Sequence, residues 1–364
     1  MKTRAAVFHG PGRALEVREI ELEEPRDDEV VVRMVSVGIC GTDLHSVKGE
    51  WQRPTPMVLG HEGAGVIEAV GDGVSSVRPG DRVVLSWAPS CGKCADCSRG
   101  RPAACVPLHR AIGAGTLVDG RTGMSLDGET LYRGTATGAL AEKVVVAERV
   151  ALPLGEDVPL EEAALLGCAA LTGIGAVLFA AHVRPNTSVV VIGAGGVGQF
   201  VLQGARLAGA ETVVSVDPVD ARREQALELG ATAAVGPEDL KKKMRELLPD
   251  GGDYAFDAVG APETTELALR WTRSGGRCVV VGLPAAGARL DLDPGEFNRR
   301  EKWLTGTMYG SEDPAVALPV LLEHVRAGRL TLRPLLGPTF PLERVNDAID
   351  ASLAGSAGRV VVQP

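Results

Sequence analysis

The stretch SVVVIGAGGVGQFVLQGARLAGAETVVSVD, residues 188–217, decides the fold of the second half of this chain. Four β-forming residues run into a glycine-rich turn, a helical pattern of apolar residues follows, and a second β-forming run ends the stretch. The pattern predicts a strand, a tight turn, a helix and a strand. In the turn, Gly193 permits the bend, Gly195 lets backbone approach a pyrophosphate, and Gly198 allows close packing of helix on strand. The stretch therefore predicts a dinucleotide site.

Asp217 ends the second strand where an acid that binds ribose hydroxyls is expected, about 20 residues after the turn. Its carboxylate would repel a 2′-phosphate, so the sequence favours NAD over NADP, although Arg222 and Arg223 lie close enough to weaken that preference. The alternative role of Asp217 is to cap the helix that follows.

The composition is that of a soluble globular protein, and the length allows two domains. The chain has 364 residues, of which 45% are hydrophobic and 23% charged, and its net charge of -9 argues against nucleic acid as a partner. The first residues lack the apolar core of a signal peptide, so we expect a cytoplasmic protein. Residues 163–181 carry no charge, but their small residues favour a helix buried inside the protein over a membrane span.

Two residues of the first half indicate a reactive metal site. Cys40 and His61 supply two of the three protein ligands that a catalytic zinc needs, and Cys168, just before the dinucleotide fold, is the natural third. Asp43 could hold the second ring nitrogen of His61. Taken singly, these cysteines and this histidine could also be inert buried residues.

A second metal site is indicated by four closely spaced thiols. Cys91, Cys94, Cys97 and Cys105 fall within 15 residues, which suits a tetrahedral zinc with no open position. An iron–sulfur cluster is the competing interpretation, and the long last gap disfavours it.

The rest of the chain divides into segments with distinct patterns of secondary structure. Residues 1–36 and 66–86 are rich in strand patterns, 106–137 resemble a long loop, and 188–308 alternate strands with helices. Six such strands predict a doubly wound parallel sheet. The tail contains two helices and a closing strand, 359–362, which we expect to return to the first domain.

These motifs, in this order, resemble the zinc-dependent medium-chain alcohol dehydrogenases. The resemblance rests on Gly60–Gly65, the four-cysteine cluster, Cys168, the glycine turn with Asp217, and Arg359. It implies an α/β protein: a GroES-like β-rich catalytic domain formed by 1–169 and 309–364, and a Rossmann domain formed by 170–308. It also implies NAD and two zinc ions per subunit as cofactors, and pairing into a homodimer or homotetramer through the strand near 303–308.

The resemblance implies a role for each site residue. Zinc on Cys40, His61 and Cys168 would lower the pKa of the alcohol, Thr42 and His45 would carry the proton away, and Glu62 would approach the zinc during ligand exchange. The implied cofactor contacts are made by Gly193, Gly195, Gly196, Val197, Gly198, Asp217, Arg222, Val281, Leu283 and Arg359. His45 and Arg359 could instead be ordinary solvated residues. Gly41 stands where many relatives have a basic residue.

Three aromatic residues, Trp51, Trp87 and Tyr132, align with pocket positions of relatives and favour a bulky or aromatic primary alcohol as the small-molecule substrate. An alternative is a glutathione-dependent formaldehyde dehydrogenase, which His109 disfavours because relatives place an arginine there; Arg110 is adjacent. Cys168 speaks against a polyol dehydrogenase. An enzyme that never releases its NAD, or a catalytically silent NAD-binding sensor, are the remaining alternatives.

Overall fold

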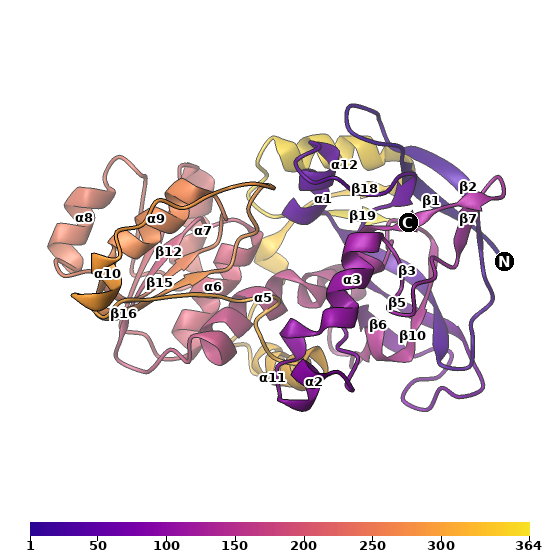
Figure 1. Ribbon diagram of the computed structural model, residues 1–364, viewed down its shortest axis with the longest axis horizontal. Coiled ribbons are helices and arrows are strands. Elements are labelled where there is room, and N and C mark those ends of the chain that lie inside the picture. Colours follow the sequence, from indigo (N-terminus) through magenta and orange to yellow (C-terminus); the bar gives the residue numbers. More distant parts are fainter. The chain divides into compact units, whose positions relative to one another are not determined.

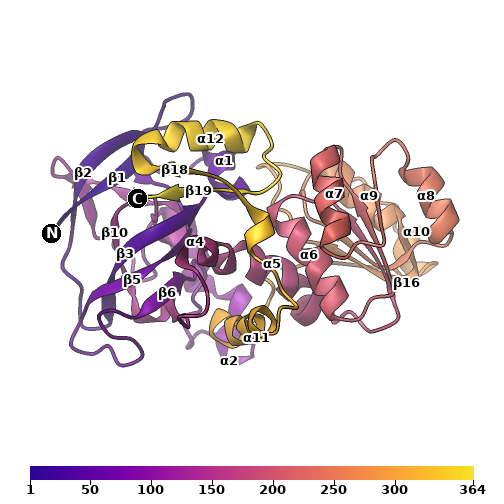
Figure 2. The same cartoon turned by 180° about the vertical axis from the view of Figure 1, so that it is seen from behind.

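The computed structural model describes residues 1–364 and divides into two compact units. The first comprises Met1–Cys168 and Asp313–Pro364, and the second comprises Ala169–Glu312 (Figures 1 and 2). The sequence places these changes at 169/170 and 308/309, so the two divisions differ by one and four residues.

The first unit contains two sheets. One has the order β8-β7-β2-β1-β4-β9, and the other has the order β11-β6-β5-β3-β19-β18 with β10 paired to β3. The strands of the first are β1 (Lys2–Phe8), β2 (Glu16–Leu22), β4 (Met57–Val58), β7 (Met124–Leu126), β8 (Glu129–Thr130) and β9 (Tyr132–Arg133). Those of the second are β3 (Glu29–Gly38), β5 (Glu62–Val70), β6 (Arg82–Leu85), β10 (Lys143–Ala147), β11 (Ala151–Pro153), β18 (Leu336–Pro341) and β19 (Arg359–Gln363).

Strand β3 is the centre of the larger sheet because its apolar residues are buried on both faces. Val30, Val31 and Val32 are fully buried in the main core of the unit. Its end pairs antiparallel with β19, Val362 opposite Val37, which confirms that the last strand returns to the first domain. The helices of this unit are α1 (Gly41–Val47), α2 (Ala95–Ser98), α3 (Val106–Ala114), α4 (Leu160–Ala163), α11 (Pro314–Arg326) and α12 (Val345–Leu353).

The prediction of a long loop over 106–137 is wrong. The segment contains α3, β7, β8 and β9. Helix α3 buries Leu108 and Ala111 and ends at Gly115, whose φ of 66° is left-handed. Short runs with two buried side chains are too brief to give a clear periodic pattern, which is why the sequence alone conceals them.

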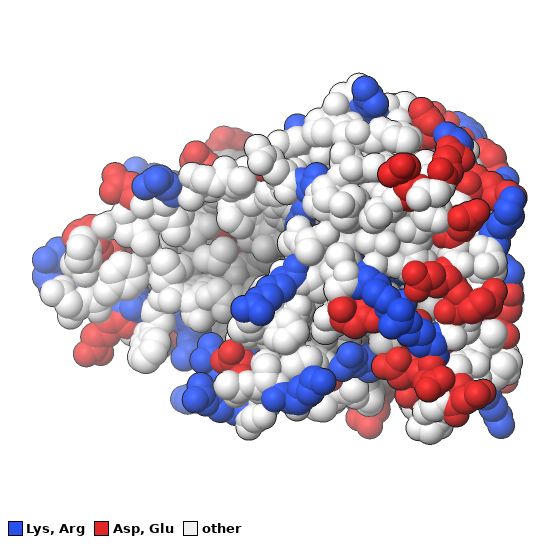
Figure 3. Space-filling view, turned by 45° about the vertical axis from the view of Figure 1, so that its right-hand side comes forward, with Lys and Arg blue, Asp and Glu red and all other residues white.

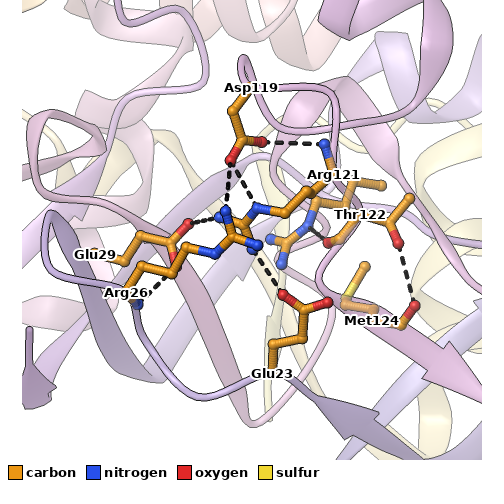
Figure 4. Close-up of polar contacts among 8 residues, drawn as sticks. Glu23, Arg26, Glu29, Asp119, Arg121, Thr122 and Met124 are labelled. Atoms are coloured by element: carbon orange, nitrogen blue, oxygen red, sulfur yellow. Dashed lines mark hydrogen bonds and ion pairs between the residues drawn. The ribbon is translucent and has the colours of Figure 1, made fainter.

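Ion pairs add to the apolar packing that ties this segment to the rest of the unit (Figure 4). Arg121 contacts Glu23 at 2.7 Å, Asp119 at 2.7 Å and the buried Glu29. Beside it, the fully buried Arg133 donates to the carbonyl oxygens of Thr122 and Thr137, and burial lowers the pKa of Arg133 to about 10. Basic and acidic side chains also lie next to each other on the right-hand part of the face seen in Figure 3.

The second unit is a parallel sheet of six strands in the order β14-β13-β12-β15-β16-β17, which confirms the doubly wound prediction. The strands are β12 (Ser188–Ile192), β13 (Thr212–Val216), β14 (Ala233–Val235), β15 (Gly252–Asp257), β16 (Thr272–Val280) and β17 (Trp303–Gly306). Its helices are α5 (Ala169–Gly175), α6 (Gly196–Leu207), α7 (Asp220–Glu228), α8 (Leu240–Leu247), α9 (Pro262–Arg270) and α10 (Gly295–Asn298). Separate apolar clusters cover its two faces, one containing Val189 and Val191 and the other Val190 and Ile192, because the side chains of a strand alternate.

The uncharged stretch 163–181 is not one helix. Its backbone breaks at Cys168, where φ is -146°, between the 3₁₀ turn Ala164–Gly167 and helix α5. No single helix of the chain is long and apolar enough to cross a membrane, whereas the pair Leu160–Gly167 and Ala169–Ala180, bent by 48°, passes by length and composition. All seven residues of α5 are buried in the protein.

Gly198 provides a test of the predicted turn. A Cβ atom there would lie 1.8 Å from the carbonyl oxygen of Gly193, so Gly198→Ala must push α6 from β12. We expect it to lower the free energy of unfolding by about 1–3 kcal/mol. Gly113→Ala is the matched control, because Gly113 lies in α3 with nothing near its Cβ position, and it should be neutral or stabilising by about 0.5–1 kcal/mol. Equal thermal midpoints for the two variants would contradict this account.

Candidate metal centres and cofactor site

The three predicted catalytic zinc ligands come together in the first unit. Ligand atoms of Cys40, His61, Cys168 and Glu62 all lie within 4.8 Å of one another, and all four residues are buried. Cys40 precedes α1, His61 precedes β5, Glu62 begins β5, and Cys168 sits at the helix break. Two thiols and an imidazole are a donor set that fits zinc.

Asp43 organises this group. Its carboxylate accepts hydrogen bonds from the backbone N–H of Cys40 and of Gly60, both at 3.0 Å, and lies 3.5 Å from Nδ1 of His61. Because Nδ1 faces Asp43, Nε2 is left as the ligand atom. Burial, the largest single effect, lowers the pKa of His61, but Asp43 and Cys40 together raise it well above its ordinary value.

The charges around the group favour a thiolate at Cys40. A hydrogen bond from Cys168 is the largest of the effects that lower the pKa of Cys40, and Arg359 and His61 add to it. Burial raises the pKa of Glu62 to about 8, against the opposing effect of Arg359, whose Nε lies 3.0 Å from Glu62 Oε2. Arg359 also donates to the carbonyl oxygen of Ile39 at 3.0 Å, so the predicted pyrophosphate ligand is part of the metal surroundings and not a solvated residue.

The four cysteines of the second motif also come together, with their sulfur atoms within 4.8 Å of one another. Backbone N–H groups point at them: that of Cys94 donates to the sulfur of Cys91 at 3.3 Å, and that of Cys91 to Cys105 at 3.3 Å. A backbone hydrogen bond from Lys93 is the main cause that lowers the pKa of Cys91 to about 6. Four thiols in reach of one another, with no fifth ligand among them, fit a closed zinc site.

The predicted relay residues lie on α1. Thr42 Oγ1 is 3.7 Å from Cys40 Sγ. His45 pairs through Nδ1 with Glu50 and stacks on Trp51, with ring centroids 4.6 Å apart. The sequence analysis did not identify Glu50; an acid five residues after a helical histidine, with Gly49 between them, was the available signal.

The three predicted pocket aromatics have different neighbours. Trp87 meets His61 edge to face with centroids 5.9 Å apart, so it does adjoin the metal ligands. Trp51 is engaged with His45 instead. Tyr132, in β9, packs against the apolar core of the first unit, and nothing in its contacts places it at the metal group.

The glycine turn has the expected geometry. Gly193 has a φ of 89°, and Gly195 caps α6 without a side-chain hydrogen bond. A Cβ at Gly195 would meet only Arg222, at 4.0 Å, so the space beside the first N–H groups of α6 fits an anion such as a pyrophosphate. Gly196 and Val197 are the first residues of α6, and Val281 is buried whereas Leu283 is 46% exposed.

Asp217 ties the turn to the end of β13. Its carboxylate accepts from the N–H of Ala194 at 2.8 Å and of Val219 at 2.9 Å, and Arg222 lies 3.7 Å away. The alternative role as a helix cap is wrong, because α7 is capped by Val219. Each carboxylate oxygen has a further lone pair with which it could accept a ribose hydroxyl.

Comparison with known proteins decides the family. Residues 26–156 match the alcohol dehydrogenase GroES-like domain and residues 196–323 match the zinc-binding dehydrogenase family. The S-(hydroxymethyl)glutathione dehydrogenase of Escherichia coli O1:K1 is 35% identical over 369 residues, with 100% of both chains covered. The chain belongs to the zinc-dependent medium-chain alcohol dehydrogenases.

Solved structures agree with this assignment. An alcohol dehydrogenase zinc-binding domain protein from Burkholderia ambifaria matches with a TM-score of 0.94 and 34% identity, over 100% of this chain and 99% of that one. Benzyl alcohol dehydrogenase from Acinetobacter calcoaceticus matches with a TM-score of 0.93 and 31% identity, over the same shares. The protein is therefore an oxidoreductase of the NAD-dependent zinc alcohol dehydrogenases, with NAD and zinc as cofactors.

The two metal groups can be separated by substitution. We expect Cys97→Ser to lose about half of the bound zinc and to lower the thermal midpoint, because a four-thiolate site stabilises the fold. Cys168→Ser should lose activity while the zinc of the four-cysteine site is retained. Elemental analysis of both purified variants checks this, and iron in place of zinc in the wild-type protein would contradict the assignment.

Proposed function

We propose that this dehydrogenase oxidises bulky or aromatic primary alcohols and reduces the corresponding aldehydes. The observation that carries the proposal is the buried Trp87 ring beside His61, since it gives an alcohol bound at this metal a flat apolar neighbour. An aromatic ring against such a wall contributes about 0.5–1.5 kcal/mol beyond its buried area. The likeness to a benzyl alcohol dehydrogenase supports the same substrate class.

Zinc binding, ligand positioning and proton transfer are assigned to different residues of the site. Cys40, His61 and Cys168 would hold the zinc, which supplies a Lewis acid that lowers the pKa of an alcohol oxygen. Asp43 fixes the backbone on either side of two of these ligands. Thr42 accepts the alcohol proton and His45 releases it, while the burial of the four-residue group excludes water. When bound, NAD would supply the hydride acceptor.

S-(hydroxymethyl)glutathione is the second candidate substrate, and the 35% identical relative of that name favours it. Such a thiol adduct carries carboxylates, which need a cationic partner. His109 uses its ring to contact the carbonyl oxygen of Ala103 at 3.0 Å, so Arg110, exposed on α3, is the side chain that would serve. A further proposal is that subunits pair through β17, where Trp303 is 62% exposed.

The test is NADH formation by the purified protein with ethanol, octanol, benzyl alcohol, sorbitol and S-(hydroxymethyl)glutathione. The highest kcat/KM for benzyl alcohol or octanol would support the proposal. The highest value for S-(hydroxymethyl)glutathione would establish the second candidate instead. NADH from none of them would leave an enzyme that retains its NAD or a silent sensor, and an artificial hydride acceptor separates these two.

Trp87→Ala tests the aromatic wall. We expect kcat/KM for benzyl alcohol to fall roughly 3- to 10-fold, the equivalent of the lost aromatic contact, with a much smaller change for ethanol. Arg110→Ala is the control, because it should affect S-(hydroxymethyl)glutathione only. An equal loss for benzyl alcohol and ethanol in Trp87→Ala would show that the ring supports His61 and does not select the substrate.

A further inference from the structure

The end of α1 turns back so that a carboxylate reaches the relay histidine. Lys48 ends the helix, Gly49 takes a left-handed φ of 73°, and the N–H of Glu50 donates to the carbonyl oxygen of His45 at 2.9 Å. A Cβ at Gly49 would lie 3.0 Å from Pro11, so the turn suits glycine twice over. The Glu50 side chain then pairs with Nδ1 of His45. The backbone turn at Gly49 therefore brings the Glu50 carboxylate close to the His45 ring.

The ring of His45 is also held on its face. Trp51 lies against it with an interplanar angle of 16°. Arg53 in turn lies over Trp51, its Cζ 5.2 Å from the ring centroid, and donates to the carbonyl oxygen of Ile112 on α3 at 2.7 Å. The indole is therefore stacked between groups anchored in two helices. This position explains Trp51 better than a role as a wall of the substrate pocket.

We propose that Glu50 is a positioning residue for His45 and the carboxylate through which the substrate proton leaves, with Trp51 and Arg53 fixing the plane of the imidazole. This inference rests on the proposed function, because it needs His45 to receive that proton. Before the transfer, the Nδ1–H of neutral His45 donates to Glu50 and Nε2 is free to accept.

The proton steps balance without any further reactant. The proton that arrives forms a bond to Nε2, the Nδ1–H bond breaks, and its proton passes to the Glu50 carboxylate. Glu50 is about one-third exposed and gives that proton to water, after which exchange with solvent restores the first tautomer of the ring, itself 21% exposed. The other charged group beside the carboxylate is Lys48, whose Nζ lies 4.0 Å from it.

The decisive variant is Glu50→Gln, which keeps the shape of the side chain and removes the proton acceptor. We expect benzyl alcohol oxidation in dilute buffer to slow about 10-fold or more, a modest share of the usual contribution of a proton acceptor. Added formate or imidazole should restore the rate, and Glu50→Asp should retain part of it. Glu16→Gln is the matched control, because Glu16 lies 3.6 Å from His9 in a second exposed pair and should change nothing.

Two outcomes would overturn the inference. One is a Glu50→Gln enzyme with the wild-type rate and the wild-type dependence on buffer concentration. The other is a slow Glu50→Gln enzyme that no added base restores, which would mean that Glu50 only supports the fold. A wild-type protein that oxidises no alcohol would contradict the proposed function instead.

A measurement independent of turnover covers that last case. Nitrogen-15 and proton NMR of labelled protein should show a downfield Nδ1–H resonance for His45 that moves upfield in Glu50→Gln, because a neutral amide oxygen accepts more weakly than a carboxylate, and that weakens in Trp51→Ala. The Glu16→Gln control should retain it. If the wild-type protein lacks this resonance, or if Glu50→Gln retains it unchanged, Glu50 does not hold the histidine and the inference fails.

Discussion

The buried carboxylate of Asp43 is the interaction on which the metal site depends. It is 2% exposed, accepts hydrogen bonds from the backbone N–H groups of Cys40 and Gly60, and faces His61. A buried charge without such partners would be costly, so the turn at Cys40 and the turn at Gly60 must both adopt the shape that supplies them. The two ligands are thereby fixed in space before any metal arrives.

Close packing around the backbone near the metal group is the second constraint, and glycines at two positions allow it. A Cβ at Gly38 would lie 2.3 Å from Glu62 Oε2, and one at Gly60 would lie 2.8 Å from Leu140. Gly60 also has a φ of 89°, which other residues rarely adopt. Glycine at positions 38 and 60 therefore lets the strand that carries Glu62 and the turn that carries His61 lie this close to their neighbours.

The sequence predicted those features whose geometry depends on residues close together in the chain. The glycine turn, the four cysteines and the order of strands in 188–308 each depend on neighbours within about 20 residues. The segment 106–137 was misjudged because Arg121 holds it to Glu23 and Glu29 across some 90 residues, and charged pairs leave no periodic pattern. The break at Cys168 was hidden for a different reason, since an apolar stretch looks the same bent or straight.

The two metal groups share cysteine ligands, but the residues around each group differ. Cys94 and Cys97 are partly exposed, and their hydrogen-bond partners are other thiols and backbone N–H groups. The four-cysteine site therefore offers only ligands typical of a structural zinc. At the other group, two thiolates would balance the charge of a divalent zinc, and an ionised Glu62 would add one negative charge too many in a buried place. Arg359, in contact with Glu62, supplies the compensating charge. This pairing would let the Glu62 carboxylate stay close to a bound zinc without adding net negative charge to the buried site.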